Sequence, residues 1–113
     1  MSTGSWTREF FGAITVCDKQ GTILEMNEQA IENFANYGGR KLIGSNLLDC
    51  HPEPSKSRLK SLMENQQRNI YTIETNGIRK IVIQSPWYEK GVYSGFIEMV
   101  TELPEDMPHY VRG

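Results

Sequence analysis

Alternating apolar and polar positions near the amino terminus predict two short β-strands. Residues 13–17 alternate around Ile14 and Val16, and residues 22–26 resume a strand pattern after a turn. The intervening Asp-Lys-Gln-Gly sequence favours a turn, because Asp can bond its own backbone and Gly accepts a positive φ. The two segments together form a predicted hairpin.

The next segment has helical spacing. Asn27 is a good helix cap, and apolar residues follow it at positions 30, 31 and 34. Gly38-Gly39 supplies a left-handed stop to that helix. Residues 40–50 are short and interrupted by Gly44, which favours one-turn helices and loop over a long helix.

Two prolines set the start of a longer helix. Pro52 and Pro54 each favour an extended residue before them, so no helix is expected to run through this segment. Because proline is tolerated in a first turn, the helix is expected to begin near Glu53 or Ser55 and to end near Asn65. Its predicted apolar stripe consists of Leu59, Leu62 and Met63.

The last third of the chain predicts three more strands. Residues 69–75 are rich in β-branched side chains, Asn76-Gly77 is a strong hairpin signal, and residues 78–85 continue as the partner strand. Pro86 is expected to stop that strand. Residues 92–102 then form a long final strand.

The two ends of the chain carry separate expectations. Ser5 can cap a short helix that places Trp6 and Phe10 on one face, where they are candidates for a dimer interface. Pro104 and Pro108 break any continuous helix after the final strand. The expected organisation is an amino-terminal helix or cap over residues 1–12, a domain over residues 13–102 and a Pro-containing tail over residues 103–113.

Composition and charge narrow the class of protein. The chain has 113 residues, of which 38% are hydrophobic and 23% charged, as in one ordinary globular domain. A formal net charge of −2 leaves no broad basic surface for nucleic acid. The longest aliphatic run, residues 81–83, is far below the about 20 residues of a membrane span, and the amino terminus lacks a secretory pattern. We therefore expect a cytoplasmic, reduced protein without nucleic-acid or membrane partners.

The order of these elements resembles that of the PAS domain family. The strand–turn–strand–Asn–helix segment of residues 13–34 is similar to the family's opening motif, with matching residues at Asp18, Gly21, Asn27, Ala30 and Phe34. Leu42-Ile43-Gly44 resembles a later Leu-x-Gly element, and residues 91–100 resemble the last strand. The HPEPS segment before the longer helix is also similar to that of a small bacterial PAS subgroup.

This resemblance implies an α+β fold, in which short helices cover one face of a five-stranded antiparallel sheet of order 2-1-5-4-3. A ligand in such domains lies between that face and the helix expected here near residues 54–65, and the amino-terminal helix commonly mediates dimerisation. The expected lining of an apolar ligand pocket is Phe34, Leu47, Leu59, Leu62, Met63, Ile81, Ile83, Phe96 and Met99. Alternation along the last strands leaves open which of their faces points inward.

Cys50 and His51 are the most reactive neighbouring pair in the sequence. In an extended segment their side chains point to opposite sides, which does not suit a nucleophile and its base. A structural zinc site needs about four N or S ligands, normally in close pairs, and Cys17 and His109 are too distant to complete one. We therefore expect neither catalysis nor a metal site.

Two cofactors are suggested by the resemblance. Some PAS domains hold haem through one histidine near the longer helix, which makes His51 a candidate haem ligand. The other interpretation is that His51 bonds a backbone carbonyl or a carboxylate and holds the loop. Light-sensing relatives carry a Gly-x-Asn-Cys run, whereas Leu47 stands here in place of that cysteine, which disfavours flavin photochemistry.

The function that the resemblance implies is that of a sensory, signal-transducing module without enzymatic activity. We expect a homodimer that binds a small apolar ligand or a separate signalling protein and signals through dimer packing. Two alternatives remain open at this point: a ligand-free protein-interaction module with a filled core, and a haem-loaded gas or redox sensor through His51.

Overall fold

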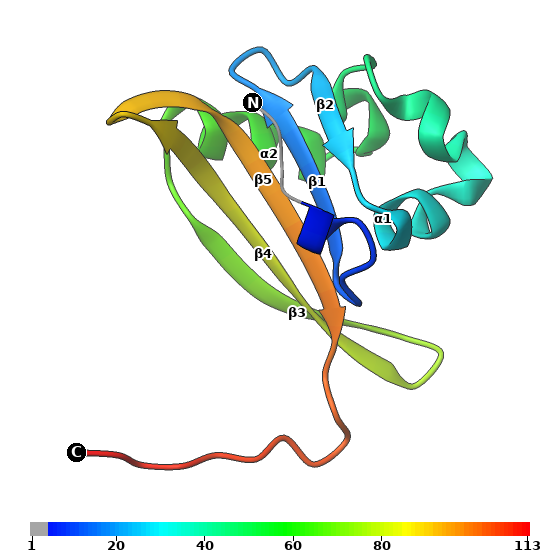
Figure 1. Cartoon of the computed structure of the whole chain (residues 1–113), viewed down its shortest axis with the longest axis vertical. Coiled ribbons are helices and arrows are strands. Elements are labelled where there is room, and N and C mark those ends of the chain that lie inside the picture. Colours follow the sequence, from blue (N-terminus) through cyan, green and yellow to red (C-terminus); the bar gives the residue numbers. More distant parts are fainter. Residues whose placement is uncertain (1–4) are drawn as a thin grey trace.

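A computed structural model describes residues 5–113 and contains one five-stranded antiparallel sheet (Figure 1). Its strands are β1 (Ala13–Asp18), β2 (Ile23–Met26), β3 (Asn69–Thr75), β4 (Ile78–Glu89) and β5 (Val92–Glu102). Their order across the sheet is β2-β1-β5-β4-β3, which confirms the predicted fold class and strand order.

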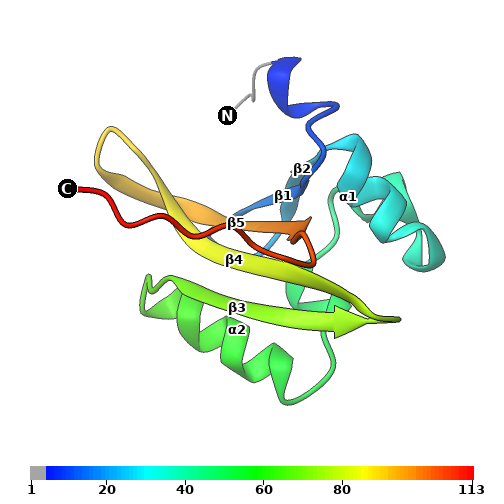
Figure 2. The same ribbon diagram turned by 90° about the horizontal axis from the view of Figure 1, so that it is seen from below.

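The helices occupy the connection between β2 and β3, apart from one turn at the amino terminus. They are the 3-10 helix η1 (Ser5–Thr7), α1 (Glu28–Asn33), η2 (Ala35–Tyr37), η3 (Gly39–Leu42), η4 (Leu47–Cys50) and α2 (Ser55–Glu64). Figure 2 shows α2 on one side of the sheet and η1 on the other. Within residues 5–113, none of these helices is long and apolar enough to cross a membrane.

The strand register decides which side chains face the helices. Cys17 of β1 pairs with Phe96 of β5, and both belong to the buried core together with Leu59 and Met63 of α2. We call the face that carries Cys17 and Phe96 the inner face. The neighbouring residues in each strand, such as Met99, point to the opposite, outer face.

Asn27 joins the amino-terminal segment, β1 and α1. Its Oδ1 atom accepts hydrogen bonds from the backbone N–H groups of Ala30 (3.0 Å) and Ile14 (2.9 Å). Its Nδ2 atom donates to the carbonyl oxygens of Thr7 (3.0 Å) and Gly12 (2.8 Å). The predicted helix cap is therefore confirmed, and the same buried side chain also fixes the start of the sheet.

The predicted boundaries of the longer helix are confirmed. Helix α2 begins at Ser55, directly after the two prolines, and ends at Glu64. Leu59 and Met63 are buried under it, and Leu62 is half-buried against the same core. The helix therefore rests on the sheet through one narrow apolar stripe.

Pro86 does not stop β4, as the sequence led us to expect. The strand continues to Glu89, and Pro86 pairs with Phe96 of β5. The ladder between β3 and β4 ends at Gln84, so beyond this residue β4 pairs on one side only. A strand with one open side tolerates a residue that lacks an N–H group.

The predicted amino-terminal helix is also shorter than expected. Only Ser5–Thr7 form a helical turn, and Phe10 lies outside it. The Thr7 carbonyl accepts a hydrogen bond from the Asn27 side chain, and the Arg8 carbonyl accepts one from the Glu28 N–H (2.9 Å). Because these bonds attach the segment to the start of α1, it does not continue as a helix. Residues 1–4 of the expected cap lie outside the described residues.

Candidate functional site: an ion pair beneath helix α2

A buried carboxylate lies on the inner face of the sheet. Glu98 of β5 is 8% exposed and sits in the same register row as Gln84 of β4 and Asn69 of β3. The Gln84 Nε2 atom donates to Glu98 Oε2 (2.9 Å), and the Asn69 Nδ2 atom donates to Gln84 Oε1 (3.1 Å). A polar row therefore crosses the surface on which α2 rests.

His51 approaches this carboxylate from the loop that leads into α2. Its Nε2 atom lies 3.7 Å from Glu98 Oε2, and its Nδ1 atom lies 3.0 Å from the carbonyl oxygen of Leu47. Because a carbonyl can only accept, Nδ1 carries a proton. A second proton on Nε2 suits the facing carboxylate, so we assign an imidazolium–carboxylate ion pair. At 3.7 Å this is an ion pair without a close hydrogen bond.

The directions in which the pKa values of His51 and Glu98 are shifted agree with this assignment. The Glu98 carboxylate raises the pKa of His51 above its usual 6.5, and the Leu47 carbonyl acts in the same direction against the effect of burial. Burial has the largest single effect on the pKa of Glu98 and raises it. The interaction with His51 and the hydrogen bond from Gln84 nevertheless hold the pKa of Glu98 below its usual 4.5.

The ion pair holds one end of α2, and a second contact holds the other. His51 ties the loop before α2 to β5, since its partners are Leu47 at the start of η4 and Glu98 in the sheet. At the far end the Tyr93 hydroxyl donates to the Met63 carbonyl (3.1 Å). The position of α2 on the sheet is therefore set at both ends by polar contacts.

The structure brings together only part of the predicted ligand pocket. Phe34, Leu47, Leu59, Leu62, Met63 and Phe96 all belong to the core on the inner face or pack against it. Ile81, Ile83 and Met99 lie on the outer face, because Ile83 pairs with Met99, and Met99 pairs with Ile14. The predicted lining therefore combined residues from both faces of the sheet, because the alternation of a strand does not show which face carries the helices.

Glu98, Gln84 and Asn69 were not among the predicted site residues. A signal for them was present, since strand alternation places Glu98 in one set with Phe96 and Val100, and Gln84 with Val82. A carboxylate between two apolar residues of one strand face predicts a buried charge with a partner. Only the fold shows that this partner is His51.

The neighbouring cysteines do not converge on the ion pair. The Cys50 Sγ atom contacts the Asn46 carbonyl (3.9 Å), while the ring of His51 turns toward Leu47 and Glu98. Burial raises the pKa of the Cys50 thiol, and burial raises the pKa of Cys17 to about 11. Both thiols are thus kept protonated and weakly nucleophilic at neutral pH. Residues 5–113 contain no group of three His, Cys, Asp or Glu side chains placed to hold a metal ion.

The residues around His51 do not fit a haem group. An iron-bound imidazole must direct a ring-nitrogen lone pair at the metal. Here Nδ1 donates to Leu47, and Nε2 faces the Glu98 carboxylate. The apolar side chains beneath α2, among them Leu59 and Phe96, are almost fully buried against one another, so a porphyrin would have to displace them.

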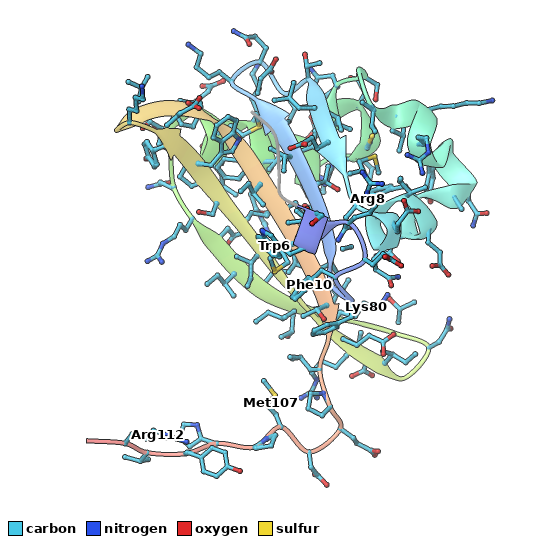
Figure 3. All side chains as sticks on the ribbon, viewed as in Figure 1. Trp6, Arg8, Phe10, Lys80, Met107 and Arg112 are labelled. Carbon is cyan, nitrogen blue, oxygen red and sulfur yellow. The ribbon has the colours of Figure 1, made fainter. Side chains whose placement is uncertain are left out.

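The aromatic residues near the amino terminus form a partly exposed group. The Trp6 and Phe10 rings meet edge to face with centroids 6.2 Å apart, and the Phe10 and Phe11 centroids are 4.9 Å apart. Trp6 and Phe11 are largely exposed, and Phe10 is half-buried. Figure 3 shows Trp6 and Phe10 beside β1 and β5, on the side of the sheet facing the viewer. Their predicted role in a dimer interface stays a prediction.

No family model and no curated protein sequence match this chain. Among solved structures, the PAS domain of BvgS from Bordetella pertussis matches 88% of this chain over 82% of its own, with a TM-score of 0.67 and 13% identity. The chain has a PAS fold. The Aer2 receptor from Vibrio cholerae, described as a dual PAS-heme oxygen sensor, matches 82% of this chain over 95% of its own at 12% identity, with a TM-score of 0.62.

A third structural neighbour has no stated function. The C-terminal domain of a protein from Streptococcus mutans matches 90% of both chains, with a TM-score of 0.70 and 16% identity. At such low identities the likeness concerns the fold, and this confirms the fold that the sequence resemblance implied. The likeness to a PAS subgroup with an HPEPS segment stays a prediction.

Proposed function

We propose that this PAS-fold chain is a sensory module that acts by binding, without catalysis, and that its responsive part is helix α2 with the loop leading into it. The observation that carries this proposal is the buried ion pair of His51 and Glu98. It fastens that loop to the sheet by a contact that a ligand or a proton can change. The Aer2 receptor among its structural neighbours, which is described as an oxygen sensor, supports the same class of function.

The chemistry of the inner face favours a small polar ligand over the apolar one that the sequence suggested. A ligand beneath α2 would meet the Glu98 carboxylate and the Gln84 amide, and these groups need hydrogen-bond partners when they are buried. A compact cation or a group with several N–H donors can replace the imidazolium of His51 at Glu98. Such a ligand would release the loop and favour another position of α2.

A ligand-free interaction module is the second candidate function. It is favoured by the packing beneath α2, where Leu47, Leu59, Met63 and Phe96 are each at most 5% exposed. In that case the side chains fill the space themselves, and a partner protein would act on α2 directly. The exposed aromatic group at Trp6 and Phe10 is the surface that the sequence offers for dimerisation. A cytoplasmic location also remains a prediction from the sequence.

Native mass spectrometry of freshly purified protein tests the proposed function. We expect a small molecule to be retained by the wild type and lost from Glu98→Gln, in which the carboxylate is replaced by an amide of the same shape. Glu102→Gln is the matched control, because Glu102 is an exposed carboxylate in the same strand. It should keep the bound mass.

A thermal-shift assay with imidazolium and methylammonium chloride provides the second readout. Both cations should raise the melting temperature of the wild type and of Glu102→Gln at constant ionic strength, and should leave Glu98→Gln unchanged. A wild type that retains no molecule and shows no shift with either cation would contradict the ligand proposal and favour the filled interaction module.

A further inference from the structure

The two edges of the sheet differ in how they are covered. Edge strand β2 has four residues, and its open side bonds to the segment around Gly44. The Ile23 N–H donates to the Ser45 carbonyl (2.8 Å), and the Gly44 N–H donates to the Ile23 carbonyl (2.8 Å). This edge is therefore short and occupied, as edges of monomeric proteins usually are.

The edge at β3 lacks these protections. It has seven residues, Asn69–Thr75, without proline, glycine or lysine. Among the described residues β3 forms a ladder with β4 only, and it lies at the free margin of the sheet in Figure 1. Ile70 is 57% exposed, and Tyr71 and Ile73 are each 41% exposed. A long, apolar edge of this kind is a template for another strand.

The charges along this edge complement those of a second copy. Arg68 directly precedes β3, and Glu74 lies near its end. If two β3 strands pair in antiparallel fashion about a two-fold axis at Tyr71, Arg68 of each copy lies opposite Glu74 of the other. The same register places Ile70 opposite Thr72 of the other copy. A parallel, in-register arrangement would instead place Arg68 beside Arg68.

We propose that two copies of this chain associate through their β3 edges and form one continuous sheet. Strand pairing supplies the main-chain hydrogen bonds, and the two Arg68–Glu74 contacts select the antiparallel register. A single strand pair buries less surface than a standard interface, so a dissociation constant of about 1–100 μM is expected. This proposal does not rest on the ligand proposed beneath α2.

This contact also competes with the dimer predicted through Trp6 and Phe10. One chain that used both two-fold contacts would assemble beyond a dimer, into a closed tetramer or a longer array. We assign the dimer to the β3 edge, because within residues 5–113 the outward main-chain donors and acceptors of this strand have no partner strand, and its charges match those of a second copy. The aromatic group then remains available for a different partner.

Charge reversal tests the pairing by sedimentation velocity on the full chain from about 1 μM to 1 mM. Arg68→Glu and Glu74→Arg should each weaken dimerisation at least about tenfold, since each places like charges opposite one another twice. The double variant Arg68→Glu/Glu74→Arg restores opposite charges and should return to within about threefold of the wild type. Far-UV circular dichroism and melting curves confirm that each variant is folded.

Two results would overturn this proposal. One is a wild type that stays monomeric over the whole concentration range. The other is a dimer whose dissociation constant is unaffected by both single reversals. If Trp6→Ala/Phe10→Ala abolishes that dimer, the contact lies at the aromatic group and the β3 assignment is wrong.

Discussion

Two buried polar clusters hold helix entrances to the sheet, and they are built differently. At α1 the neutral Asn27 amide bonds four backbone groups at 2.8–3.0 Å. At α2 the charged pair of His51 and Glu98 meets at 3.7 Å, and each partner can gain or lose a proton. The contacts of the first cluster do not depend on protonation, whereas the contact that the second makes with the sheet does.

This difference makes the contacts at α1 insensitive to pH and the ion pair at α2 sensitive to it. The hydrogen bonds of Asn27 do not change with pH, because neither its side-chain amide nor the backbone groups that it bonds titrate in the physiological range. Neutralising one partner of a buried ion pair leaves the other charge without a counter-ion and lowers stability. The region of α2 and its loop is therefore the part of the fold best suited to respond to a signal.

The largest expected effect comes from removing the neutral cluster. Asn27→Ala deprives two N–H groups and two carbonyl groups of their buried partner. We expect a loss of about 3–5 kcal/mol in the free energy of unfolding, measured by urea denaturation. Because no titrating group is involved, the loss should be the same at pH 6 and pH 8.

Asn33→Ala is the matched control for this variant. Asn33 lies on α1 and is exposed, and among the described residues its side chain bonds only that of Gln29 (3.2 Å). Its loss should stay within about 0.5 kcal/mol. An Asn27→Ala loss as small as that of the control, or one that changes between pH 6 and pH 8, would contradict the contrast drawn between the two clusters.

A smaller effect is expected at the charged cluster. His51→Ala leaves Glu98 buried without its counter-ion and should lower the free energy of unfolding by about 2–3 kcal/mol at pH 6. The His51 side chain is 17% exposed, which keeps the loss below that of a fully buried pair. His109→Ala, in the exposed tail, is the control and should be neutral.

Hydrogen exchange distinguishes a local effect of His51→Ala on α2 from a general loss of stability. His51→Ala should increase exchange in α2 and in the loop before it, while α1 keeps its protection. A uniform increase over the whole sheet would instead mean that the variant unfolds globally and that the pair has no local role.

Most of the fold could be predicted from sequence because local signals agreed with one another. Asn27 and Asn76-Gly77 each mark a boundary by chemistry that acts over a few residues, and both boundaries are found where they were expected. Gly38 has the predicted left-handed conformation, but it ends the 3-10 helix η2, because α1 already ends at Asn33. The predictions were wrong where contacts between residues far apart in the sequence determine the local structure. Pro86 remains in β4 because β3 ends earlier, and the amino-terminal helix is cut short because Asn27 binds its carbonyls.

The candidate site could be predicted only in part for the same reason. His51 stood out in the sequence, since it lies in a proline-rich loop before a helix. Its partner Glu98 is 47 positions away, and the pairing depends on β5 lying at the centre of the sheet. The placement of Ile81, Ile83 and Met99 likewise depended on which sheet face the helices cover, and the alternation of one strand does not contain that information.

The most direct test asks whether the contribution of the His51–Glu98 ion pair to stability depends on pH. The free energy of unfolding should be compared between the wild type and His51→Gln/Glu98→Gln from pH 4 to pH 9. The contribution of His51, whose pKa is raised, is complete below its usual 6.5 and is lost as pH rises through the raised value. That of Glu98, whose pKa is lowered, is complete above its usual 4.5 and is lost as pH falls through the lowered value. The wild type should therefore exceed the double variant most between about pH 4.5 and 6.5, and this advantage should shrink toward pH 9. An advantage that stays constant or grows from pH 6 to pH 9 would contradict the ion pair and the function proposed from it.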